Sequence, residues 1–121
     1  MSKILKSLFS LTILLYSFNI NAIEMDSSFV EGIDDLPLHE KMQVIKESLV
    51  LFDTYKGKLV EVKISGETDI SIIRDFYSDI LPNLGWMKKS NNKYIRGNDI
   101  LSIEYSNNNI GSTVKFELIE K

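Results

Sequence analysis

The chain has 121 residues, no cysteine and a formal net charge of −3 at pH 7. A chain of this length suggests one domain, and the lack of cysteine excludes disulfides, thiolate metal sites and a cysteine nucleophile. The acidic balance also argues against a nucleic-acid-binding protein, which normally carries a basic stripe.

Residues 1–22 predict a signal peptide. Lys3 and Lys6 precede a mostly apolar run over residues 7–20, and Ala22 offers a small residue at a cleavage position. The apolar run is short for a membrane span, which needs roughly 20 apolar residues. Cleavage after Ala22 leaves 99 residues with 12 basic and 17 acidic side chains, a net charge of −5.

This leader places the expected protein in the periplasm or outside the cell, with no stable membrane insertion after cleavage. The many isoleucine, asparagine and lysine residues are typical of an AT-rich genome and favour a bacterial source. The alternative is a protein anchored in the inner membrane through an uncleaved leader.

Residues 23–47 are interpreted as an acidic, loosely ordered lead-in to the domain. Residues 23–40 contain several acids, no lysine or arginine, one glycine and one proline. The stretch just before residue 48 is compatible with one helical turn or with an extended lead. Four apolar side chains could dock the lead-in onto the domain surface: Phe29, Val30, Ile33 and Leu36.

The domain proper, residues 48–121, is expected to begin with a β-hairpin. Residues 48–53 are short, apolar and rich in strand formers. Residues 58–65 alternate, with Val60, Val62 and Ile64 on one face and polar side chains on the other, which is typical of a half-buried strand. A turn around Gly57 joins the two strands.

A single amphipathic helix is predicted next. Thr68 or Asp69 can cap it, because a side-chain oxygen there accepts from a free backbone N–H. Pro82 weakens the last turn and Gly85 suits the left-handed position just past a helix end, so Trp86 begins the return to the sheet. Apolar residues at steps of three and four form one stripe: Ile73, Phe76, Tyr77, Ile80 and Leu84.

The rest of the chain predicts a β-meander. Four candidate strands are separated by asparagine- and glycine-rich turns near residues 91, 97 and 107–111. The expected fold is therefore α+β, with one amphipathic helix packed on an antiparallel sheet of five or six strands, ββα followed by the meander. The other face of the sheet is expected to be mostly solvated.

Two stretches, FDTYKGKL over residues 52–59 and FYSDILPNLGW over residues 76–86, resemble a family of small exported proteins of alphaproteobacteria. The family pattern is F-D-T-x-x-G-[KR]-[LIV], then F-Y-x-x-x-L-P-x-L-G-W and a short meander. Tyr55 stands where the family often has proline. The resemblance covers roughly residues 48–120 and implies export and this architecture, but no catalytic residue.

Two candidate binding sites involve aromatic and basic residues. Tyr77 and Trp86 could form an aromatic ligand platform, or they could fill the corner between the helix and the sheet. A positive patch is formed by Lys88, Lys89, Lys93 and Arg96, with Tyr94 among them. It could meet an acidic partner, a phosphate-bearing lipid head group or the acidic lead-in of its own chain, or it could simply be solvated.

No motif for catalysis or for a cofactor is found. The only histidine, His39, has no nearby nucleophile turn and no set of metal ligands, and the glycines are scattered singly. We therefore expect a non-catalytic binding or adaptor module of the cell envelope, without a cofactor. The alternative is a small ligand-binding protein or hydrolase with a pocket near Tyr77 and Trp86.

An envelope protein is the expected partner, and the expected mode is the addition of a strand to an open edge of the sheet. The final strand, residues 112–120, is long, and the sequence suggests that it lies at this edge.

Overall fold

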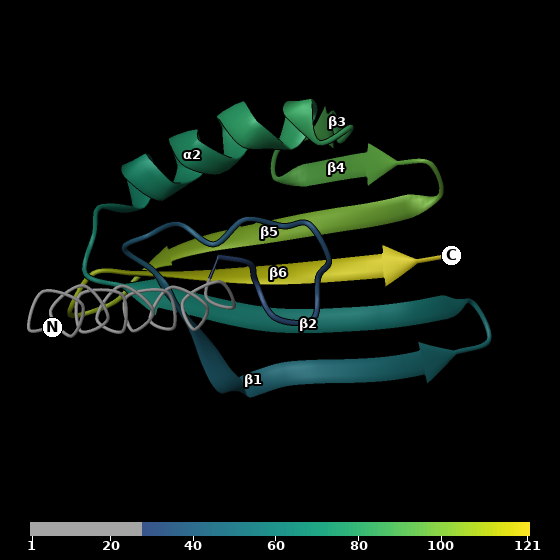
Figure 1. The fold of residues 1–121 in the computed structure, drawn as a ribbon, viewed down its shortest axis with the longest axis horizontal. Helices are drawn as coiled ribbons and strands as arrows, with labels where there is room; N and C mark the ends of the chain where they lie inside the picture. The colour runs from purple at the N-terminus through teal and green to yellow at the C-terminus, as the bar shows by residue number, and fades with distance from the viewer. Residues whose placement is uncertain (1–27) are drawn as a thin grey trace, which may run out of the picture.

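A computed structural model describes residues 28–121, so the predicted signal peptide and the first residues of the lead-in lie outside the described residues. The described part is one helix and one six-stranded antiparallel sheet, which confirms the predicted α+β fold (Figure 1). The elements are β1 (Gln43–Thr54), β2 (Gly57–Gly66), α2 (Ile70–Asn83), β3 (Met87–Ser90), β4 (Lys93–Arg96), β5 (Asp99–Asn107) and β6 (Ser112–Glu120).

The strand order is β1-β2-β6-β5-β4-β3. After the β1–β2 hairpin, α2 carries the chain across the sheet to its far side, and β3, β4, β5 and β6 then return strand by strand (Figure 1). The prediction that residues 112–120 lie at an edge is wrong, because β6 pairs with β2 on one side and β5 on the other. The edges are β1 and β3.

Helix α2 begins and ends as its sequence predicts. The Asp69 carboxylate accepts a hydrogen bond from the Ser71 N–H at 3.0 Å, which also lowers the pKa of Asp69. At the other end Gly85 has φ of 90°, and the Trp86 N–H donates to the Leu81 carbonyl at 3.1 Å. The chain therefore turns back sharply at Trp86. The fully buried side chains of the helix are Ile73, Tyr77 and Leu81.

The segment from residue 28 to residue 42 packs on the same face of the sheet as α2. In Figure 1 it runs across β5, β6 and β2. The expectation of a loosely ordered lead-in is wrong here, whereas the suggested docking through Val30, Ile33 and Leu36 is confirmed. These three side chains and Met42 are buried in the common core. The Val30 N–H donates to the Leu36 carbonyl at 2.9 Å, which closes the segment into a compact loop. Phe29 is half exposed.

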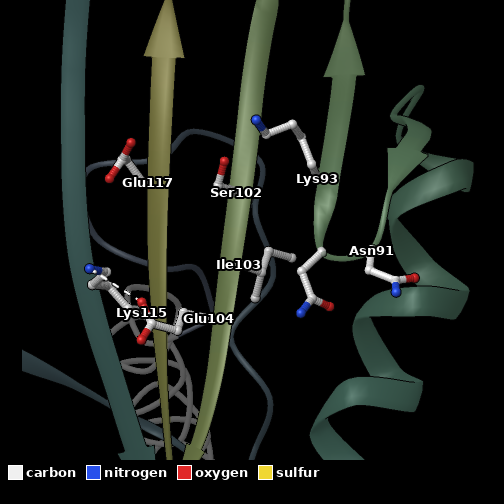
Figure 2. Close-up of a pocket in the computed structure, with 8 residues that line it drawn as sticks. Asn91, Lys93, Ser102, Ile103, Glu104, Lys115 and Glu117 are labelled. Carbon is white, nitrogen blue, oxygen red and sulfur yellow. Dashed lines mark ion pairs between the residues drawn. The ribbon is translucent and has the colours of Figure 1, made fainter.

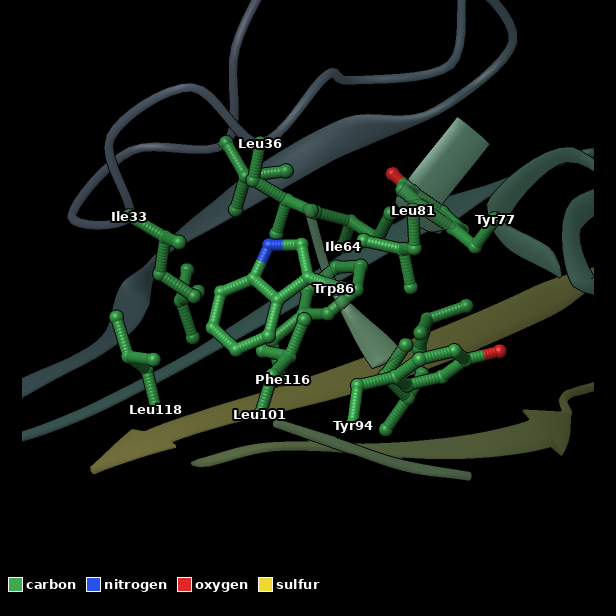
Figure 3. Packing of buried hydrophobic residues seen from close by; sticks show 14 of the residues in the cluster. Ile33, Leu36, Ile64, Tyr77, Leu81, Trp86, Tyr94, Leu101, Phe116 and Leu118 are labelled. Atoms are coloured by element: carbon green, nitrogen blue, oxygen red, sulfur yellow. The ribbon is translucent and has the colours of Figure 1, made fainter. Parts of the chain in front are cut away.

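The core lies between the sheet and this cover of helix and loop. The sheet contributes the alternate residues of its central strands, which the sequence pattern identified on β2. Figure 3 shows Trp86 in the middle of the cluster, with Leu36 on the side of the N-terminal loop. The buried residues from the strands are Val60, Val62, Ile64, Tyr94, Leu101, Ile103, Val114, Phe116 and Leu118.

Strand β1 begins at Gln43, five residues earlier than the sequence suggests. Its pairing with β2 shifts register between Ile45 and Val50. Within this bulge the Ser48 hydroxyl accepts from the Lys63 N–H at 2.8 Å and donates to the Ile45 carbonyl. Because a bulge interrupts the two-residue alternation of a strand, the sequence pattern of this region did not reveal the earlier start.

Candidate binding surface

The face of the sheet opposite α2 carries an unbroken row of apolar side chains. The pairing registers place one apolar residue on each strand opposite the next, across all six strands. These residues alternate with the buried ones, so they face away from the core. We call them the apolar row: Phe52, Leu59, Ile119, Ile100, Ile95 and Met87. The two ends of the row are open to solvent, since Phe52 is 59% and Met87 is 75% exposed.

A row of charged side chains lies beside the apolar row on this open face. The Lys115 ammonium is 3.4 Å from the Glu104 carboxylate and 4.0 Å from that of Glu61, as Figure 2 shows for Glu104. The hydrogen bond to Glu104, and then the charges of Glu104 and Glu61, raise the pKa of Lys115. These surface pairs add little stability, because water and salt screen them.

A shallow hollow of about 270 Å³ opens over the same charged side chains (Figure 2). Asn91, Lys93, Ser102 and Glu117 line it together with Lys115. The hollow is widely open to solvent, whereas a small-molecule site encloses most of its ligand. Among the charged side chains of the hollow, Lys115 and Glu104 form an ion pair with each other.

The two edges of the sheet differ in how they are protected. Edge strand β3 has only four residues and carries Lys88 and Lys89, and short, lysine-bearing edges discourage further pairing. Edge strand β1 has twelve residues, and Val50, Leu51 and Phe52 are 46%, 62% and 59% exposed. These three successive side chains project to both faces of the sheet, so β1 is the open apolar edge of the molecule.

Tyr77 and Trp86, the predicted aromatic platform, are core residues. Tyr77 is fully buried and Trp86 is 3% exposed. The Tyr77 ring packs edge-on against Phe116 at 5.1 Å between centroids, and its hydroxyl donates to the Pro37 carbonyl at 2.8 Å. These contacts hold the N-terminal loop, α2 and β6 together, and they match the corner-filling role that the sequence also suggested.

The predicted basic patch is divided between core and surface. Arg96 donates to the Asp35 carboxylate at 2.9 Å and to the Leu84 carbonyl at 3.0 Å. Its guanidinium also lies 4.3 Å from the centroid of the Trp86 ring, in cation–π contact. Arg96 thus fastens the loop to the end of α2. Tyr94 is buried, whereas Lys88, Lys89 and Lys93 are exposed side chains available to a partner.

Residues 28–121 contain neither a candidate metal site nor a helix that could span a membrane. In this range no three histidine or acidic side chains lie close enough to hold a metal ion. His39 accepts a hydrogen bond from the Lys41 N–H at 3.1 Å and packs edge-on against Phe76, so it serves the loop. The one helix of this range, α2, is too short to cross a membrane.

No protein-family model, curated protein or solved structure matches the chain. The resemblance to small exported alphaproteobacterial proteins therefore stays a prediction based on the two motifs.

The sequence did not point to the β1 edge or the apolar row. Leu59, Ile95, Ile100 and Ile119 each stand out of phase with the buried residues of their strand, and this was the available signal. It could not be used without the pairing registers, because only these show that the four residues lie side by side.

Replacing Tyr77 with phenylalanine is expected to lower the free energy of unfolding by about 1–3 kcal/mol, because the Pro37 carbonyl loses its donor inside the structure. Urea unfolding followed by tryptophan fluorescence measures this loss. Tyr55→Phe is the matched control, since Tyr55 is 95% exposed. Equal stability of the two variants would contradict the buried hydrogen bond.

The protein is expected to lose stability above about pH 10. Burial raises the pKa of Tyr77 from its ordinary value of 10.0, more than a backbone hydrogen bond with His39 lowers it, and burial also raises the pKa of Tyr105. The unfolded chain therefore ionises first, so the stability present below pH 10 is lost as pH rises. Urea midpoints at about pH 8 and pH 11 test this, and Tyr77→Phe should show the smaller difference between them.

Proposed function

We propose that the protein is an exported, non-catalytic binding module of a bacterial envelope, which binds its partner by adding a strand to the β1 edge. The observation that carries this proposal is the exposure of Val50, Leu51 and Phe52 on an edge strand of twelve residues. A strand that docks there gains main-chain hydrogen bonds along the edge and apolar contacts on both faces.

Packing favours this function over a small ligand-binding protein or hydrolase. A pocket near Tyr77 and Trp86 would need space beside the two rings, and both are enclosed by core side chains. The hollow on the open face is shallow and widely open to solvent, and the Lys115–Glu104 ion pair lies in it. A binding module needs neither an enclosed pocket nor catalytic groups, and the β1 edge supplies the surface that it does need.

Export is part of the same proposal. It is supported by the leader pattern of residues 1–22 and by the resemblance of the two motifs to small exported proteins. Mass spectrometry of the protein isolated from bacteria is expected to find Ile23 at the N-terminus. A chain that still begins at Met1 would support the inner-membrane anchor instead.

The edge mode can be tested with lysine substitutions. Leu51→Lys places a charge on the β1 edge, which discourages strand addition, and Ile72→Lys places the same charge on the exposed side of α2. Tagged full-length genes are expressed in bacteria, cells are cross-linked, and the adducts are purified under denaturing conditions. The cross-linked complexes that the unaltered protein forms with its partner should be absent for Leu51→Lys and present for Ile72→Lys. Adducts that persist in both variants would overturn the β1 edge as the binding surface.

A further inference from the structure

The part of the β1 edge beyond the bulge, residues 50–54, lacks the features that usually prevent strands from pairing. Residues 50–54 of β1 pair regularly with β2, contain no proline, and carry their single charge at Asp53. The other side of β1 meets no strand within residues 28–121. An exposed apolar edge of this kind is a template for another strand, so the remaining question is which strand fits it.

We infer that the strand which fits best is β1 of a second copy, giving a two-fold dimer with one continuous twelve-stranded sheet. This inference rests on the proposed function and names its partner. A dimer of identical chains needs a self-complementary patch. Val50, Leu51 and Phe52 form such a patch. All three are apolar and exposed, and the two outer residues face the open side of the sheet while the middle residue faces the side of α2, so the pattern is the same in either chain direction.

Geometry restricts the register of such a dimer. A two-fold axis perpendicular to the sheet keeps the open faces of both copies on the same side, and opposed residues of antiparallel strands share a face. At the axis, a residue of one copy must therefore lie opposite the same residue of the second copy. Three centres are available in the apolar triplet, namely Val50, Leu51 and Phe52.

Only the centre at Leu51 gives every apolar side chain of the triplet an apolar neighbour. In this register Leu51 lies opposite Leu51 of the second copy, and Phe52 lies opposite Val50 of the second copy. A centre at Val50 would place Phe52 opposite Ser48, and a centre at Phe52 would place Leu51 opposite Asp53. The Leu51 register also places Asp53 opposite the uncharged Leu49, so no like charges oppose each other over residues 48–54.

The same register extends the apolar row. Phe52 is the solvent-exposed end of this row in one copy, and Val50 of the second copy would lie directly beside it on the open face. The Phe52 ends of the two rows are thus covered together with the open edge, while the Met87 ends stay exposed. The paired segment is short, so the interface falls in the small class, below about 1,200 Å², that is typical of weak complexes.

Cysteine cross-linking tests the register directly, because the chain has no cysteine of its own. Directly opposed residues of an antiparallel pair have Cα atoms about 4.5–5.5 Å apart, within the range of a disulfide. We expect Leu51→Cys to form a disulfide-linked dimer under mild oxidation much faster than Tyr55→Cys, which is more exposed. Val50→Cys mixed with Phe52→Cys should also cross-link, and faster than either variant alone.

Sedimentation over a range of concentrations gives an independent readout. The protein expressed from its full-length gene should change from monomer to dimer as its concentration rises, with a dissociation constant in the micromolar range expected of a small interface. Leu51→Lys should weaken this association about tenfold or more, since like charges then meet at the axis. Met87→Lys, at the other end of the apolar row, should leave it unchanged.

The outcomes separate this inference from the proposed function. A protein that stays monomeric, or a Leu51→Cys variant that cross-links no faster than Tyr55→Cys, overturns the dimer. If Leu51→Lys still abolishes adducts with other envelope proteins, the β1 edge remains a binding surface for a different strand. If these adducts also persist, the proposed function fails together with the dimer.

Discussion

Replacing Trp86 with alanine is expected to lower the free energy of unfolding by about 3–5 kcal/mol, the usual cost of truncating a large buried aromatic side chain. Trp86 is 3% exposed and lies in the middle of the core, among side chains from the N-terminal loop, α2 and the central strands (Figure 3). Its loss would leave a cavity at the point where all these parts meet, and Arg96 would lose its ring partner.

The size of this effect is large for a domain of this length. Small domains are stable by roughly 5–15 kcal/mol, so the variant is expected to be partly unfolded at moderate urea concentrations. Urea unfolding followed by far-ultraviolet circular dichroism measures the loss without relying on the removed fluorophore. Tyr55→Ala, at an exposed turn position, should change the stability by less than about 0.5 kcal/mol. A similarly small loss in Trp86→Ala would show that the indole does not fill the core.

Replacing Gly57 with alanine is expected to cost roughly 2–4 kcal/mol of unfolding free energy. Gly57 opens β2 after the hairpin turn and has φ of 134°, a conformation that side chains other than glycine rarely adopt. A Cβ atom at this position would collide with the Glu120 carbonyl oxygen of the neighbouring strand β6. Because this neighbour is backbone, the end of β6 must shift away from β2 to make room for the Cβ atom.

Gly97→Ala is the matched control for this prediction. Gly97 also has a positive φ, of 61°, but a Cβ atom there would meet no other atom within 4 Å. It should cost only about 1 kcal/mol, the penalty of the left-handed conformation alone. Thermal or urea unfolding of the two variants separates the backbone strain from the collision with Glu120. Equal losses would contradict the close approach of β2 and β6 at Gly57.

Local chemistry decided the parts of the fold that the sequence predicted correctly. Asp69, Pro82 and Gly85 set the ends of α2 through their own backbone and capping preferences. The alternation of Val60, Val62 and Ile64 marks one face of β2 as buried, whichever strand lies beside it. Such signals depend on neighbours in the chain, so a single sequence is enough to interpret them.

The pairing of distant strands was not accessible in the same way. Nothing local distinguishes β6 as a central strand from β6 as an edge strand, since both carry one apolar and one polar face. Its place follows from α2, which carries the chain to the far edge and forces the meander to return toward β2. The apolar row has the same origin, because its members belong to six strands and are neighbours only in the paired sheet.

For the candidate site residues, too, the sequence left alternatives open and tertiary contacts decided between them. For Tyr77 and Trp86 the sequence offered either a ligand platform or a structural corner, and aromatic side chains serve both purposes. Burial beneath the loop of residues 28–42 decided for the corner. Arg96 belonged to a predicted positive patch for which the acidic lead-in was one possible partner, and the ion pair with Asp35 decides for that partner at Arg96.

The sequence by itself determined the class of the fold, the helix with its two ends, the strands of the meander and the expectation of an exported chain. Only the tertiary structure decided which strand forms the open edge, that the lead-in covers the core, and that an apolar row crosses the open face. The physical reason is that propensities and caps act between neighbouring residues, whereas edges, faces and burial arise from contacts between segments far apart in the chain.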